Sequence, residues 1–185
     1  ENIRSSGIIA IRLKDKDCLV FCGLTTGEND ILLTTAEGQS IRFHEKDVRS
    51  MGRTAGGVSG IKLKGDKDRV VGAIIIPGKS SSLFLTTVSE MGYGKKTSLD
   101  EYKVQNRGGS GIITYKDNDK TGKLVSAREI NEKIDTDMLI ATQSGMVIRV
   151  DTKQIPKLGR ATLGVKLIKI KGNDKVTSVA LIEDE

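Results

Sequence analysis

Short apolar runs separated by polar turns dominate the chain. The runs span four to eight residues, are rich in Ile, Leu, Val and Thr, and are bounded by Gly, Asp, Asn and Ser, which is typical of β-strands. In residues 32–43, 83–97 and 139–150, two such runs flank a tight polar turn that contains glycine. Because glycine adopts the positive φ angle that hairpin turns require, each segment predicts a β-hairpin. No stretch keeps a long helical period, and residues 46–51 and 99–104 predict about one helical turn each.

The pattern repeats along the chain, with units at about residues 1–53, 54–108, 109–160 and 161–185. Each full unit reads as strand, polar turn, strand and hairpin, so we expect strands at 7–13, 18–26 and 57–63 as well as in the hairpins. The hairpin glycines (Gly38, Gly92, Gly145) and an arginine near each unit's end (Arg53, Arg107, Arg160) recur in register. A single domain of such units predicts an all-β, propeller-like array of four-stranded blades, with three full repeats and a partial fourth.

Composition narrows the possible chemistry. The 185 residues carry 30 Lys and Arg against 24 Asp and Glu, a formal net charge of +6 that favours a polyanionic partner. No apolar run reaches the ~20 residues that a membrane helix needs, so we expect no membrane partner. Cys18 and Cys22 share one face of an expected strand, which predicts buried thiols, and with His44 they are too few for a zinc site. No catalytic constellation is visible, so we expect no catalytic residue, no metal and no cofactor in this domain.

Basic residues recur at equivalent places in the units. On the outgoing hairpin strands these are Arg42, Lys95, Lys96 and Arg149. After those strands the series continues with Lys46, Arg49, Arg53, Lys103, Arg107, Lys153, Lys157 and Arg160. Since equivalent positions of a radial array share one rim, the series predicts a curved basic track that binds duplex DNA through its phosphates. Basic residues that merely keep strand edges soluble are the alternative, and sparse aromatics argue against single-strand stacking.

The segment QNRGGSG joins the second and third units. It comprises Gln105, Asn106, Arg107, Gly108, Gly109, Ser110 and Gly111. It follows no strand-to-helix pattern and lacks the lysine of a phosphate-binding P-loop. We therefore interpret it as a turn between blades whose N–H groups, beside Arg107, are suited to receive a phosphate.

At residues 41–63, 90–102, 144–165 and 174–182 the chain resembles the C-terminal domains of the DNA gyrase A family. The resemblance covers nearly the whole chain. It implies a β-pinwheel, a disc of propeller-like blades that wraps double-stranded DNA around a basic rim and supports negative supercoiling. It also implies an A2B2 assembly with the N-terminal core of gyrase A and with gyrase B, in the bacterial cytoplasm at the nucleoid. The cleavage tyrosine, ATP and magnesium would belong to those other parts.

The family's signature is a basic seven-residue box of the form QRRGGRG. QNRGGSG keeps five of these positions and replaces two basic ones with Asn106 and Ser110. The resemblance thus implies a degenerate copy, with the full box upstream of Glu1 and the chain a C-terminal piece or a member with fewer blades. The related C-terminal domain of topoisomerase IV, which binds DNA with little wrapping, remains an alternative. So does a propeller-like scaffold for protein interactions.

Overall fold

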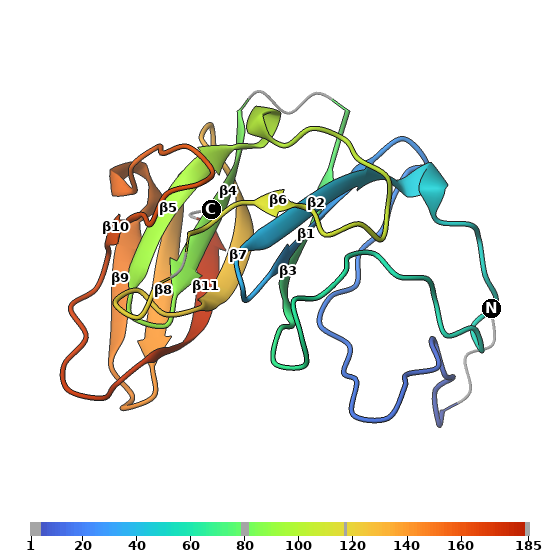
Figure 1. Cartoon of the computed structure of the whole chain (residues 1–185), viewed down its shortest axis with the longest axis horizontal. Helices are drawn as coiled ribbons and strands as arrows, with labels where there is room; N and C mark the ends of the chain where they lie inside the picture. The colour runs from blue at the N-terminus through green and yellow to red at the C-terminus, as the bar shows by residue number, and fades with distance from the viewer. Residues whose placement is uncertain (1–4, 79–81, 117, 184–185) are drawn as a thin grey trace.

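The computed structural model describes residues 5–78, 82–116 and 118–183, and it confirms the all-β prediction (Figure 1). The strands form three antiparallel sheets. Sheet A has the order β3-β1-β2-β6, made of Val70–Ile76, Asp30–Thr35, Gln39–His44 and Ile112–Ile113. Sheet B has the order β10-β5-β4-β7, made of Val165–Lys166, Tyr93–Ser98, Leu83–Ser89 and Leu124–Asn131. Sheet C has the order β11-β8-β9, made of Val176–Glu183, Thr136–Thr142 and Val147–Asp151.

Each sheet contains one hairpin, as the sequence predicts: β1–β2 in sheet A, β4–β5 in sheet B and β8–β9 in sheet C. Gly38, Gly92 and Gly145 occupy the three turns with φ angles of +77°, +75° and +88°. Each hairpin is followed by a short 3-10 turn, at Glu45–Asp47, Leu99–Glu101 and Thr152–Gln154. The residue before each turn caps it: the side chain of His44, Ser98 or Asp151 accepts a hydrogen bond from the backbone N–H two residues on.

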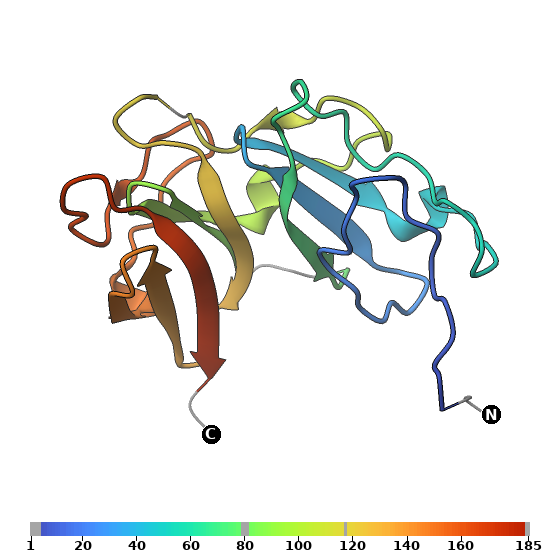
Figure 2. The same ribbon diagram turned by 90° about the horizontal axis from the view of Figure 1, so that it is seen from below.

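The sheets interleave the sequence units rather than following them. In sheet A, the hairpin β1–β2 comes from the first unit, β3 from the second and β6 from the third. Sheet B is assembled in the same way from the second, third and fourth units. Sheets A and B match the expected four strands, whereas sheet C has three among the described residues. Figure 2 shows the three sheets side by side in a curved row.

Three expected strands do not form. Residues 7–13, 18–26 and 57–63 run without strand hydrogen-bond ladders within the described chain. Many apolar side chains of the first two segments are exposed, Leu24 at 97%, because no described strand pairs with these segments to form a sheet. Cys18 and Cys22 are exposed free thiols, so the prediction of buried thiols was wrong. Figures 1 and 2 show this N-terminal segment looping beside sheet A.

Apolar side chains fill the spaces between neighbouring sheets. Leu32, Ile74, Ile76, Leu85 and Tyr102 belong to the core between sheets A and B. A second cluster, which includes Val88, Met138, Ile140, Ile155 and Val179, packs sheet B against sheet C. Each sheet is too small to bury its own faces, so stacking of neighbours supplies the stabilising apolar burial. Among the described residues, no helix has the length and hydropathy needed to cross a membrane.

Candidate nucleic-acid interface

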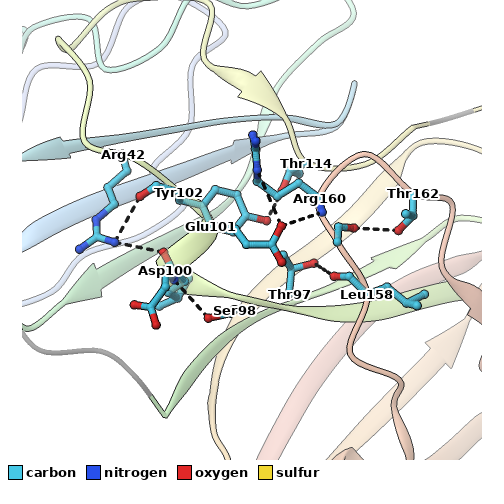
Figure 3. A network of polar contacts seen from close by, with 12 residues as sticks. Arg42, Thr97, Ser98, Asp100, Glu101, Tyr102, Thr114, Leu158, Arg160 and Thr162 are labelled. Carbon is cyan, nitrogen blue, oxygen red and sulfur yellow. Dashed lines mark hydrogen bonds and ion pairs between the residues drawn. The ribbon is translucent and has the colours of Figure 1, made fainter.

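Arg42 on β2 is held inside the junction between sheets A and B. Its guanidinium forms an ion pair with Asp30 at 2.8 Å, and its side chain is only 11% exposed. The same group donates hydrogen bonds to the carbonyl oxygens of Leu99 at 3.1 Å and Tyr102 at 3.3 Å. Figure 3 shows Arg42 beside Tyr102. Arg42 therefore ties its own hairpin to the 3-10 turn of the next one, and the prediction that it projects from a basic rim was wrong.

Lys96 takes the same structural place on β5. Its ammonium donates to the carbonyl oxygen of Thr152 at 3.1 Å and lies 3.1 Å from a carboxylate oxygen of Glu132. Phe84 on β4 is equivalent to Asp30 on β1. Asp30 pairs with His44 at the end of β2, and Phe84 pairs with Ser98 at the end of β5. The Lys96 ammonium lies 5.9 Å from the centre of the Phe84 ring, within range of a cation–π contact. Lys96 is 4% exposed, so it too is a junction residue rather than a rim residue.

Lys95 is fully buried, which contradicts the sequence-based prediction most strongly. Its ammonium donates to the carbonyl oxygens of Gly159 and Arg160 and, at 3.0 Å, to the hydroxyl of Thr162. Burial lowers the pKa of Lys95 to about 8, opposed by the carboxylate of Glu101. The side chain fastens the segment that follows the third hairpin onto β5. A buried amine with this role cannot contact DNA.

The rest of the basic series comprises Arg149 on β9 and the residues that follow the outgoing strands. These residues are exposed or partly exposed, and several are ion-paired. Lys46 pairs with Glu28 at 2.6 Å, and Lys157 pairs with Glu132 at 2.7 Å. The remaining pairs are Arg149–Asp137, Lys153–Asp135 and Arg160–Glu101. The hydrogen bonds from Lys157 and Lys96 hold the pKa of Glu132 below its usual value.

Arg49, Arg53 and Lys103 are exposed, as predicted. Within the described chain, no acidic group forms an ion pair with any of these three residues. Their charges are thus the least compensated of the predicted set.

The segment 105–111, here called the junction box, lies alongside β2. The N–H of Gln105 donates to the Arg42 carbonyl at 2.7 Å, and the N–H of Gly108 donates to the Gly60 carbonyl at 2.8 Å. Arg107 is partly exposed and donates from its side chain to the carbonyl oxygens of Asp47 and Ser59. The junction box is therefore a turn between blades, as the sequence indicates, with its arginine at the surface.

Gly111 explains why the junction box ends in glycine. Its φ angle is +69°, and a Cβ atom there would lie 2.4 Å from the carbonyl oxygen of Ser40. Gly164 occupies the same place one unit later, with a φ angle of +75° and a Cβ position 2.5 Å from the Gly94 carbonyl oxygen. Glycine thus permits the chain to approach the backbone of the outgoing strand at both positions.

The acidic partners of the basic series were missed at the sequence level. Asp30 and Asp137 recur opposite the ends of β2 and β9, facing His44 and Asp151. This in-register recurrence was the available signal that basic residues on the outgoing strands are paired. Glu132 carries no such signal, because it pairs across sheets.

The described residues contain no group of three or more His, Cys, Asp or Glu side chains that could hold a metal. Burial raises the pKa of Tyr102 to about 12, and its hydroxyl contacts Thr114. The exposed basic residues therefore remain the candidate site on this scaffold.

Comparisons with known proteins agree with this picture. The family described as "DNA gyrase C-terminal domain, beta-propeller" matches residues 1–25, 29–77, 84–131 and 136–183. The last three segments follow sheets A, B and C, since each starts at a hairpin and ends with the strand beside it.

Similar proteins include the DNA gyrase A protein of Ureaplasma parvum serovar 3, 42% identical over 99% of this chain and 21% of the relative. The DNA gyrase A protein of Lawsonia intracellularis is 41% identical over 90% of this chain and 20% of the relative. The chain thus spans about a fifth of the length of these relatives.

Two solved structures share the fold. A DNA gyrase A C-terminal domain superposes with a TM-score of 0.80 at 27% identity, over 94% of this chain and 57% of that one. A C-terminal domain of DNA topoisomerase IV superposes with a TM-score of 0.87 at 24% identity, over 99% of this chain and 56% of that one.

Proposed function

The chain belongs to the DNA gyrase C-terminal domain family, and from this premise we propose that it binds duplex DNA without sequence specificity. The observation that carries the proposal is the recurrence of Arg53, Arg107 and Arg160 at the blade junctions, where Arg53 is exposed and the other two partly exposed. DNA presents one phosphate charge per ~1.7 Å of duplex, so a row of surface cations suits its backbone rather than its bases.

The contacts with DNA come from the exposed part of the basic series. Arg49, Arg53 and Lys103 are exposed and have no ion pair within the described chain. The exposed ion pairs also take part, because such a pair is worth only about 0–1 kcal/mol and a phosphate can replace its carboxylate. Lys95, Lys96 and Arg42 hold the blades together and contribute only by positioning the surface.

The duplex follows the curved row of blades and is bent or wrapped by it. In the parent enzyme the wrapped segment is delivered to the N-terminal core of gyrase A, and gyrase B hydrolyses ATP to drive negative supercoiling in the cytoplasm. The chain acts there as an accessory domain of a type II topoisomerase within an A2B2 assembly. Because Asn106 and Ser110 replace basic positions of the family's box, the junction box here contributes less to wrapping than a full box.

A charge-neutralised variant tests the binding proposal. The triple variant Arg49→Gln, Arg53→Gln and Lys103→Gln removes three exposed charges that make no ion pair in the described chain. Log affinity falls with log salt, and each lost phosphate contact makes this fall less steep by about 0.9. We expect the fall to be less steep by about 2 to 3, equally on two duplexes of unrelated sequence. The control variant Lys16→Gln, Lys120→Gln and Lys133→Gln removes the same charge from exposed lysines that form no ion pair within the described chain.

If the salt dependence of affinity is the same for the test and control variants, the assignment of Arg49, Arg53 and Lys103 to the DNA-binding surface is contradicted. Wrapping is tested separately by relaxing circular DNA in the presence of the chain and measuring the linking number after deproteinisation. If the chain wraps DNA, the linking number shifts. If the chain binds the circle but the linking number does not change, binding is retained and wrapping is refuted. A protein-interaction scaffold predicts no duplex binding even at low salt.

A further inference from the structure

A second basic series recurs in the units, outside the one predicted from the hairpins. Arg12, Lys62, Lys116 and Lys169 each lie five residues after a glycine of positive φ. The glycines are Gly7, Gly57, Gly111 and Gly164. All four basic residues are exposed, and none forms an ion pair with the described acidic groups. Unlike most of the hairpin series, this series is therefore uncompensated.

Equivalent backbone hydrogen bonds at three positions attach this series to the blade junctions. The backbone N–H of Arg12 donates to the Ala55 carbonyl at 3.3 Å, and that of Lys62 donates to the Gly109 carbonyl at 2.9 Å. In the next unit Lys116 donates to the Thr162 carbonyl at 3.3 Å. Each acceptor lies two residues after one of the junction arginines, Arg53, Arg107 and Arg160. The fold thus brings the two basic series to the same place at every described junction.

The surface is hollowed at two of these junctions, in equivalent positions. A hollow of about 520 Å³ is lined by Lys62, Lys64, Ser110 and Gln39, together with apolar and glycine positions. The preceding junction has a hollow of about 470 Å³ lined by Arg12, Lys14 and Asp17. The first hollow, next to the junction box, has no acidic residue in its lining, whereas Asp17 offsets part of the charge in the second.

We propose that the hollow formed by Lys62, Lys64, Ser110 and Gln39 is a seat for a DNA phosphate, beside the junction box. This inference rests on the proposed duplex binding and assigns it an additional contact. Two ammonium groups supply charge, and a hydroxyl and an amide supply hydrogen bonds, which is a donor set suited to a phosphate diester. The Arg12 and Lys14 hollow is a weaker copy because of Asp17.

The seat explains how the junction box contributes although two of its basic positions are missing. Ser110 lies in the lining, while Lys62 and Lys64 come from the neighbouring segment and supply the charge that Ser110 lacks. A phosphate held there would contact Lys62, a member of the second basic series, and Ser110 of the junction box. The duplex would thus be held at the junction by residues from three sequence units rather than by the box alone.

The experiment compares the double variant Lys62→Gln, Lys64→Gln with the matched control Lys120→Gln, Lys133→Gln, in the 185-residue chain. Affinity for a fluorescent duplex is measured over a range of KCl concentrations. Two lost phosphate contacts predict a fall of log affinity with log salt that is less steep by about 2, with the control unchanged. The double variant Arg12→Gln, Lys14→Gln should reduce the steepness by less.

Lysine reactivity supplies a second measurement that needs no variant. We expect bound duplex to protect Lys62 and Lys64 of the wild-type chain from an amine-specific reagent, while Lys133 stays reactive. A double variant that binds like the control, or unprotected Lys62 and Lys64 on a bound duplex, would overturn the seat while leaving the proposed function intact. A wild-type chain that binds no duplex at low salt would instead refute the proposed function itself.

Discussion

Replacing Lys95 with methionine tests whether this residue has a structural role in the protein interior rather than a contact with DNA. The substitution keeps most of the apolar stem and removes the ammonium that donates to Gly159, Arg160 and Thr162. These acceptors lose a buried partner, which costs about 1–3 kcal/mol, while the penalty for burying a charge disappears. The net change at pH 7 is therefore small, and the informative quantity is its dependence on pH.

The magnitude follows from the pKa. The folded chain releases the Lys95 proton near pH 8, whereas the unfolded chain holds it until about pH 10.5. Between these values the unfolded state binds more protons, so stability rises with pH in this window. At 1.36 kcal/mol per pKa unit, titration of Lys95 adds about 2 kcal/mol to the free energy of unfolding between pH 7 and pH 9.5.

Urea denaturation of the wild type and of Lys95→Met at the two pH values measures this effect. Other groups titrate equally in both proteins, so the difference between their free energies of unfolding isolates Lys95. We expect the wild type to gain about 2 kcal/mol relative to the variant on going to pH 9.5. Parallel stability curves would show that the Lys95 amine is solvated and would refute its role in the junction. The salt slope of DNA binding should be the same for both.

Two further substitutions test how the blades are joined. Asp30→Asn leaves the Arg42 guanidinium without its carboxylate in a nearly buried site, and we expect it to lower the free energy of unfolding in urea by about 3 kcal/mol. Gly111→Ala places a Cβ atom 2.4 Å from the Ser40 carbonyl oxygen, so we expect a lower melting temperature than for Gly57→Ala, which has the same kind of φ angle but open space around it. Gly57→Ala should cost only the left-handed backbone strain of about 1–2 kcal/mol, and equal melting temperatures would contradict the close approach at Gly111.

The local features of the fold were predictable from the sequence. The hairpins at Gly38, Gly92 and Gly145 follow from apolar alternation around a glycine turn, and the structure confirms them. Because these hairpins recur in register along the chain, the sequence also indicated several similar sheets packed side by side. The sequence pattern did not predict that strands from different units share one sheet. The pairing of β6 with β2, for example, joins residues of the third and first units.

The burial of basic residues was unpredictable for a related reason. A lysine on a strand is normally a solvent-facing residue, yet the acceptors of Lys95 lie in the segment after the next hairpin. Arg42 is covered in the same way by the turn at Leu99–Glu101. Conversely, residues 18–26 have the pattern of a strand but lack a described neighbour to pair with, so pattern alone overstated their order.

The affinity of the 185-residue chain for two duplexes of unrelated sequence, measured across a range of salt concentrations, tests the central claim most directly. If exposed cations at the blade junctions bind the DNA backbone, log affinity falls linearly with log salt, with the same slope of several units on both duplexes. A slope near zero, or binding to only one of the two sequences, would contradict the account.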